Sequence, residues 1–173
     1  SAIIRQHYSN ELTARMAYHS LHVFQNFAEV VGGECGFTQC GFLVVVAEAD
    51  KAGLEANIAM QQKIGIETRL VSSEEIKKLM PGLRTAVSLS GAYEPQSGYA
   101  DPYLTVTSYA QAARRLGATI HQETEVTAIR MADGKVQGVD TTQGSFDAPV
   151  VLNCTGAWGA QVAKLADVEV PID

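Results

Sequence analysis

The sequence predicts a mixed α/β fold: a partial parallel core with an antiparallel flap, beside part of a smaller mixed sheet. Uncharged apolar runs, rich in β-branched residues, at 42–47 and 150–152 are typical of buried strands. Apolar residues recur at helical spacing over 11–31 and 102–116. Residues 133–134 are Asp-Gly, the sequence of a tight hairpin turn between two strands of the flap.

The first long helix is predicted over residues 11–31. Ser9 and Asn10 stand before it as start signals, and Gly32 and Gly33 end it. Its buried face is expected to consist of the apolar residues Leu12, Met16, Leu21, Phe24, Phe27, Ala28 and Val31.

Between residues 38 and 99, strands interrupted by helices predict a small mixed layer. Strands are expected at 42–47, 66–71 and 86–93. A helix is expected at 51–63, with Asp50 as its cap. Another begins at Ser72, because Ser72 and Glu75 have the spacing of a capping box.

The last third predicts a helix, a strand, a meander, a strand and a second helix. Asp101 is a good N-cap and Pro102 suits the first helical position. A short strand is expected at 118–121, and the strand at 150–152 leads through small residues into a helix that begins at Trp158. Such a strand-to-helix crossing exposes backbone N–H groups to a ligand, so this order is half of a dinucleotide-binding architecture.

Composition excludes several classes of partner. The net charge of -6 and the pI of about 5.2 argue against binding to nucleic acid or an anionic membrane. Three cysteines without a repeated spacing predict reduced thiols and a cytoplasmic location. His19 and His22 lie one turn apart but lack further ligands, so no metal site is predicted.

Four stretches resemble the D-amino-acid oxidase/sarcosine oxidase family of FAD-dependent oxidoreductases, which includes dimethylglycine dehydrogenase-like proteins. They are Ile3-Ile-Arg5 with Tyr8, the Gly98-to-Pro102 stretch before a helix, 116–129, and 150–158. Each stretch alone is weak, but their order and spacing over nearly the whole chain make the combination fairly specific.

The resemblance implies a partial, Rossmann-like FAD-binding domain at 1–37 and 100–173, and a substrate-domain segment at 38–99. Family members begin with a strand and a Gly-x-Gly-x-x-Gly turn that holds the FAD pyrophosphate, and this sequence has neither. The chain is therefore expected to be an internal piece of a longer enzyme. By itself it is expected to bind FAD weakly or not at all, and to be inactive.

The resemblance also implies site residues. Arg5 matches the arginine that holds a substrate carboxylate, since a guanidinium offers two parallel donors; the alternative is a surface ion pair. His7 and Tyr8 could line the same pocket, although His7 could equally be a solvated loop residue. Residues expected near the cofactor are Val126, Thr155, Gly156, Ala157 and Trp158.

The implied reaction is oxidation of a C–N bond in a small carboxylated amine of the sarcosine, glycine or D-amino-acid type, by hydride transfer to FAD. Two alternatives stay open: a dehydrogenase of a hydroxy acid or glycerol phosphate, and a non-catalytic subunit that kept the fold. Expected partners are the amine substrate and further subunits, either copies of the chain or those of a heteromeric flavoenzyme complex. Neither nucleic acid nor membrane is expected.

Overall fold

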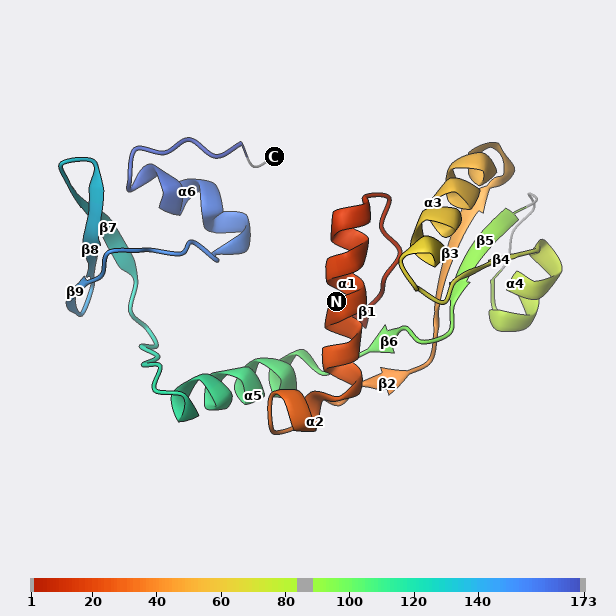
Figure 1. Cartoon of the computed structure of the whole chain (residues 1–173), viewed down its shortest axis with the longest axis horizontal. Helices are drawn as coiled ribbons and strands as arrows, with labels where there is room; N and C mark the ends of the chain where they lie inside the picture. Colours follow the sequence, from red (N-terminus) through yellow and green to blue (C-terminus); the bar gives the residue numbers. More distant parts are fainter. Residues whose placement is uncertain (1, 84–88, 172–173) are drawn as a thin grey trace. The chain divides into compact units, whose positions relative to one another are not determined.

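The computed structural model describes residues 2–83 and 89–171, which form two compact units, Ser1–Ala118 and Thr119–Asp173. Its described strands form three sheets, each of three antiparallel strands, with helices between them in sequence (Figure 1). The mixed α/β class is therefore confirmed. The division into FAD-binding segments at 1–37 and 100–173 and a substrate segment at 38–99 stays a prediction.

The central sheet of the first unit has the order β3-β5-β4, with β3 at Phe42–Ala47, β5 at Leu89–Glu94 and β4 at Arg69–Val71. Helix α3 (Lys51–Lys63) covers one face, where Leu54 and Ile58 pack against Ala92. Helix α4 (Ser73–Leu79) covers the opposite face (Figure 1). There the Ile76 side chain lies against Gly91, the residue before Ala92 on β5. The strand predicted at 86–93 begins outside the described residues.

A smaller sheet joins the N-terminus to the middle of the chain. Strands β1 (Ile3–Ile4) and β2 (Thr38–Gln39) pair with opposite edges of β6 (Gly98–Tyr99). Beside it, Phe27, Val31 and Cys35 form an apolar cluster to which Ala112 of helix α5 (Pro102–Arg115) adds. The sheet fixes the chain just before Arg5.

The predicted helix over 11–31 forms as two pieces, α1 (Glu11–Gln25) and α2 (Phe27–Val30). Asn10 caps α1 as predicted: its side-chain oxygen accepts from the Thr13 backbone N–H at 3.2 Å. The break falls at Asn26, whose side-chain and backbone N–H groups both donate to the His22 carbonyl. The predicted buried face is wrong at Leu12 and Met16, which are 69% and 63% exposed, and at Ala28, which is also exposed.

Two other predicted caps are confirmed, whereas Asp50 stands before α3 without a side-chain capping bond and Trp158 ends a 3-10 turn just before α6. Ser72 and Glu75 form the capping box of α4, with each side chain bonded to the other's backbone N–H. Asp101 accepts from the Leu104 backbone N–H at 2.9 Å at the start of α5, where Pro102 occupies the first turn. No helix among residues 2–83 and 89–171 is long and apolar enough to cross a membrane.

The second unit is built on the predicted flap. Strands β7 (Val126–Ala132), β8 (Lys135–Thr141) and β9 (Gly144–Asp147) form an antiparallel meander. Asp133 and Gly134 both have positive φ in the turn between β7 and β8, as a type I′ hairpin requires. A 3-10 turn, η2 (Gly156–Trp158), and helix α6 (Gly159–Lys164) follow.

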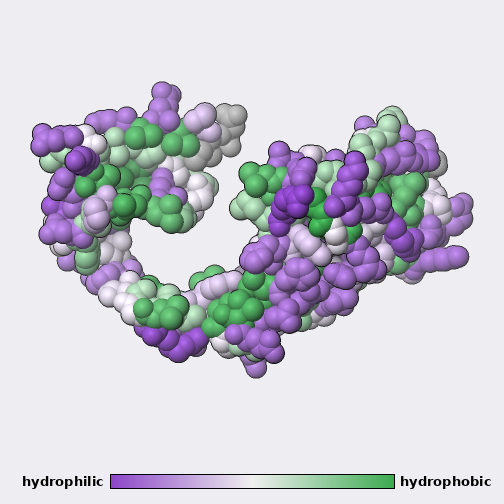
Figure 2. All heavy atoms as spheres, in the orientation of Figure 1, coloured by the Kyte–Doolittle hydropathy of each residue, from purple (hydrophilic) through white to green (hydrophobic). Residues whose placement is uncertain are grey.

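The two strands predicted for a parallel core, 118–121 and 150–152, do not form. Val150 and Leu152 are instead 77% and 84% exposed, and apolar atoms lie on the surface of this unit (Figure 2). A strand forms only where its backbone groups have a neighbouring strand to bond with. None of the described residues provides one to 150–152.

Candidate functional site

Arg5 lies exposed directly after β1, between two aromatic rings. Its guanidinium carbon is 5.1 Å from the centroid of the Tyr8 ring and 5.7 Å from that of Phe42. These cation–π contacts stabilise the side chain by about 0.5–1 kcal/mol each at an exposed site. Arg5 forms no ion pair with a carboxylate of the described residues, so the alternative of a surface ion pair is not observed there.

His7 is largely enclosed, although it lies two residues after the exposed Arg5. Its side chain is 9% exposed, and its Nδ1 lies 3.7 Å from Oε1 of Glu94. Burial, aided by the charge of Arg5, lowers the pKa of His7. The imidazole is therefore neutral at pH 7.

Glu94, at the end of β5, is a buried carboxylate that the sequence did not single out. Its side chain is fully buried, and Oε2 accepts from the Gln6 backbone N–H at 2.9 Å and from the Ser97 hydroxyl at 2.8 Å. Burial raises the pKa of Glu94, while these two bonds and the charge of Arg5 oppose the rise. Glu94 thus fixes the residue that follows Arg5.

His7 and Tyr8 also line an open hollow between the segment after β1, strand β3 and the start of α3. The other residues that line it are Ser9, Val44, Val46, Ala49, Asp50, Gly53, Leu54 and Asn57. The Gln61 side chain on α3 donates to the Tyr8 carbonyl at 3.0 Å, which holds this segment against the helix. The three predicted substrate residues therefore lie close together in the segment that follows β1.

In the second unit, Asn153 shapes the small-residue crossing. Its side-chain oxygen accepts from the Thr155 hydroxyl at 2.6 Å and the Thr155 backbone N–H at 3.2 Å, and its amide donates to the Gly159 carbonyl at 2.9 Å. Gly156 has a φ of +57°, and no heavy atom lies within 4 Å of where its Cβ would stand. The crossing is therefore open at Gly156.

Three of the predicted cofactor residues, Val126, Thr155 and Trp158, line one hollow of about 470 Å³. Leu152 lines it too, and Trp158 is 65% exposed rather than packed. Gly156 and Ala157 lie in η2 beside it but are not among its lining residues. The lining is partly apolar, through Val126, Leu152 and Trp158, and it also includes the acidic Glu125.

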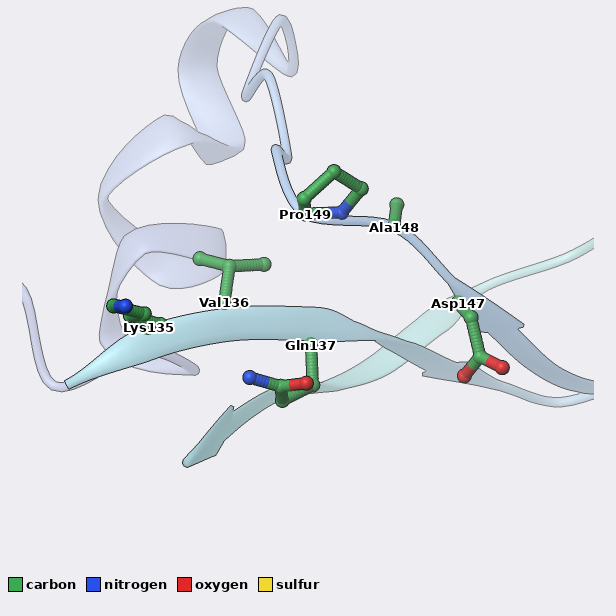
Figure 3. Close-up of a pocket in the computed structure, with 6 residues that line it drawn as sticks. All are labelled: Lys135, Val136, Gln137, Asp147, Ala148 and Pro149. Atoms are coloured by element: carbon green, nitrogen blue, oxygen red, sulfur yellow. The ribbon is translucent and has the colours of Figure 1, made fainter. Parts of the chain in front are cut away.

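A different hollow lies along β8 and the chain that follows β9 (Figure 3). Val136 and Gln137 point to opposite sides of the strand, and Ala148 and Pro149 lie along the side that Val136 faces. The predicted site residues do not line this hollow, so it carries no role in the site.

The comparisons decide the family. A family model for FAD dependent oxidoreductases, the DAO family, matches residues 1–173. The chain belongs to this family. Its similarity to the DAO family agrees with the resemblance of the four sequence stretches and with the mixed α/β fold.

Individual DAO relatives match the chain over part of their own length. Mitochondrial sarcosine dehydrogenase of Mus musculus is 30% identical over 156 residues, which are 87% of this chain and 17% of that protein. Sarcosine oxidase subunit beta of Rhodobacter capsulatus is 26% identical over 178 residues, 100% of this chain and 43% of that protein. The crystal structure of L-proline dehydrogenase from P. horikoshii has a TM-score of 0.88 and 28% identity, covering 100% of this chain and 46% of that chain. The chain thus spans less than half the length of these relatives.

Proposed function

We propose that the chain is part of an FAD-dependent enzyme that oxidises a C–N bond of a small carboxylated amine, of the sarcosine, glycine or D-amino-acid type. The observation that carries this proposal is Arg5, an exposed guanidinium held between two rings and without a carboxylate partner among the described residues. A substrate carboxylate would accept two parallel charge-assisted bonds from it. Relatives named for sarcosine and L-proline support this substrate class.

In this proposal, His7 and Tyr8 lie around the substrate with Arg5. Tyr8 contacts the guanidinium by its ring, and neutral His7 leaves Arg5 to supply the positive charge for the carboxylate. The role of these residues is to orient the substrate, because correct orientation of a reacting carbon lowers the barrier without any chemical step by the protein.

The cofactor residues in this proposal are Val126, Thr155, Gly156, Ala157 and Trp158. The backbone of Val126 and the open crossing at Gly156 would contact FAD, and Trp158 would cover part of it. When bound, FAD supplies the two-electron acceptor that oxidation of an amine requires. The amine is expected to react in its neutral form, since a protonated nitrogen has no lone pair to support loss of hydride from the neighbouring carbon.

Assembly with further subunits is part of the proposal. A relative named as a subunit of sarcosine oxidase supports a heteromeric flavoenzyme, and homo-oligomers are the other expectation. A cytoplasmic location stays a prediction, and the relative named sarcosine dehydrogenase is mitochondrial.

The test is anaerobic reduction of the flavin in the enzyme that contains this chain. Sarcosine, glycine and D-alanine are each added without oxygen, and the loss of flavin absorbance is followed. We expect these substrates to reduce the flavin, whereas methylamine, which lacks the carboxylate, reduces it far more slowly. Reduction by lactate or glycerol phosphate alone would favour the hydroxy-acid or glycerol-phosphate alternative, and a preparation without flavin would favour a non-catalytic subunit.

A further inference from the structure

Two buried polar atoms, both within reach of the charge of Arg5, lie near each other without a hydrogen bond. They are Nδ1 of His7 and Oε1 of Glu94, 3.7 Å apart, and neither has a hydrogen-bond partner among the described residues. An unsatisfied buried polar group costs about 1–3 kcal/mol. Such a pair therefore calls for an explanation beyond packing.

A single proton between Glu94 and His7 would satisfy both of these atoms. Oε2 of Glu94 already accepts two hydrogen bonds, from the Gln6 backbone N–H and the Ser97 hydroxyl, so a proton on this carboxyl belongs on Oε1. From there it can be donated to Nδ1 of neutral His7, which lies 3.7 Å away. A proton taken up from solvent would close the gap to a hydrogen bond of ordinary length and satisfy both atoms.

We propose that Glu94 and His7 are positioning residues that share one proton. The affinity of Arg5 for a substrate carboxylate then depends on whether that proton is present. This inference rests on the proposed function, because it takes Arg5 as the residue that binds the substrate carboxylate.

The connection from Glu94 to Arg5 is short. Pairing of Ile4 with Gly98 fixes the backbone before Arg5, and the 2.9 Å bond from Gln6 to Glu94 fixes the backbone after it. Phe42, whose ring supports the guanidinium, is the residue directly opposite Glu94 across strands β3 and β5. A change in the charge or position of Glu94 therefore reaches Arg5 through its own backbone and through its ring contact.

The charges around the pair determine the sign. Arg5 and Tyr8 come from the same segment as His7, and Asp50 lines the hollow beside His7 at the start of α3. Of these, Arg5 is the charge that acts on both partners. When Glu94 loses its proton, its negative charge offsets that of Arg5, so the site attracts an anionic substrate less strongly.

The first test is an NMR titration of the chain itself, from pH 4 to 8. The backbone N–H of Gln6 reports on Glu94 and the His7 ring carbons report on the imidazole. We expect the Gln6 resonance to titrate with a midpoint above the ordinary carboxyl value of 4.5, to lose that titration in Glu94→Gln, and to shift its midpoint in His7→Asn. Glu55→Gln, an exposed carboxylate on α3, is the matched control and should leave the titration unchanged.

The second test is the Michaelis constant for sarcosine in the enzyme that contains the chain. Glutamine can accept the bonds from Gln6 and Ser97 as Glu94 does, but it cannot ionise. We therefore compare the ratio of the native KM to the KM of Glu94→Gln at different pH values. This ratio should rise roughly fivefold as pH increases through the midpoint found by NMR, which is the order expected of one charge in a partly buried site. Glu94→Ala, which loses both bonds, should raise KM about tenfold or more with little change in kcat, because about 1.4 kcal/mol of lost substrate binding is a tenfold change.

The outcomes separate the two proposals. A Gln6 resonance that does not titrate, or that titrates equally in Glu94→Gln, overturns the shared proton. A titration by NMR with a flat KM ratio overturns the link to Arg5. An enzyme that oxidises no carboxylated amine overturns the proposed function, while the NMR result still decides whether Glu94 and His7 share the proton.

Discussion

Adding a single methyl group at Gly98 should destabilise the small sheet that fixes the backbone before Arg5. It lies in β6 between β1 and β2, and a Cβ there would overlap the Thr38 carbonyl oxygen and stand 2.9 Å from the Thr38 carbonyl carbon. The obstructing atoms are backbone, so they cannot turn away as a flexible side chain could. Gly98→Ala should therefore reach the upper end of the overpacking range, about 3 kcal/mol.

Urea unfolding and thermal unfolding, followed by circular dichroism, measure this cost. A loss of about 3 kcal/mol should lower Tm by about 10 °C in a chain of this size. Gly53→Ala is the matched control, because Gly53 lies within α3 and no atom stands within 4 Å of its Cβ position. There the same change should stabilise the helix by about 0.5–1 kcal/mol.

A Gly98→Ala protein as stable as the native one would refute this reasoning. It would mean that β6 does not lie between β1 and β2, and that the backbone before Arg5 is not fixed as described. The same conclusion would follow if both glycine substitutions changed stability equally.

Three further predictions follow from the structure. Ser72→Ala removes the side-chain half of the capping box and should cost about 1 kcal/mol in urea unfolding. Because the pKa of Glu94 is raised, its contribution to the free energy of unfolding is full below pH 4.5 and is lost as pH rises through the folded-state pKa. The pKa of His7 is lowered, so its contribution is full above pH 6.5 and is lost as pH falls through the folded-state pKa. Glu94→Gln should therefore gain stability relative to the native protein between pH 4.5 and pH 8, and an equal difference at both would contradict the buried carboxylate. Gly156→Val should weaken FAD binding about tenfold or more in a fluorescence titration of the enzyme, whereas Gly144→Val, equally open and also at positive φ, should not.

Local signals in the sequence predicted the helix starts well. Asn10, Asp101 and the Ser72–Glu75 pair each cap a helix where predicted, because a cap depends only on residues within one turn. Strand β3 and helix α3 have the predicted bounds, since a continuous apolar run and a glycine after a helix are also local signals.

Predictions that depended on distant partners were less successful. Val150 and Leu152 are apolar enough for a buried strand, yet their backbone has no neighbouring strand among the described residues. Leu12 and Met16 have the spacing of a buried face, but nothing described covers them. Periodicity predicts which residues share a face, and it cannot say whether another segment packs on that face.

The candidate site shows the same division. Arg5 could be chosen from its motif, whereas no local pattern indicates that Glu94 is buried. Its position follows from the register of β5 against β3, which places it opposite Phe42, and from the turn to Ser97. Neither contact is visible in the spacing of residues along the chain.

The most direct measurement of the central claim is the KM for sarcosine in Arg5→Ala, compared with Arg15→Ala. Arg15 is an exposed arginine paired with Glu11 on α1, so it controls for loss of a positive charge. Loss of a charge-assisted contact with the carboxylate costs about 1.5–3 kcal/mol, so KM in Arg5→Ala should rise about tenfold to a hundredfold, with Arg15→Ala near the native value. Equal KM values in the native enzyme and Arg5→Ala would contradict the account.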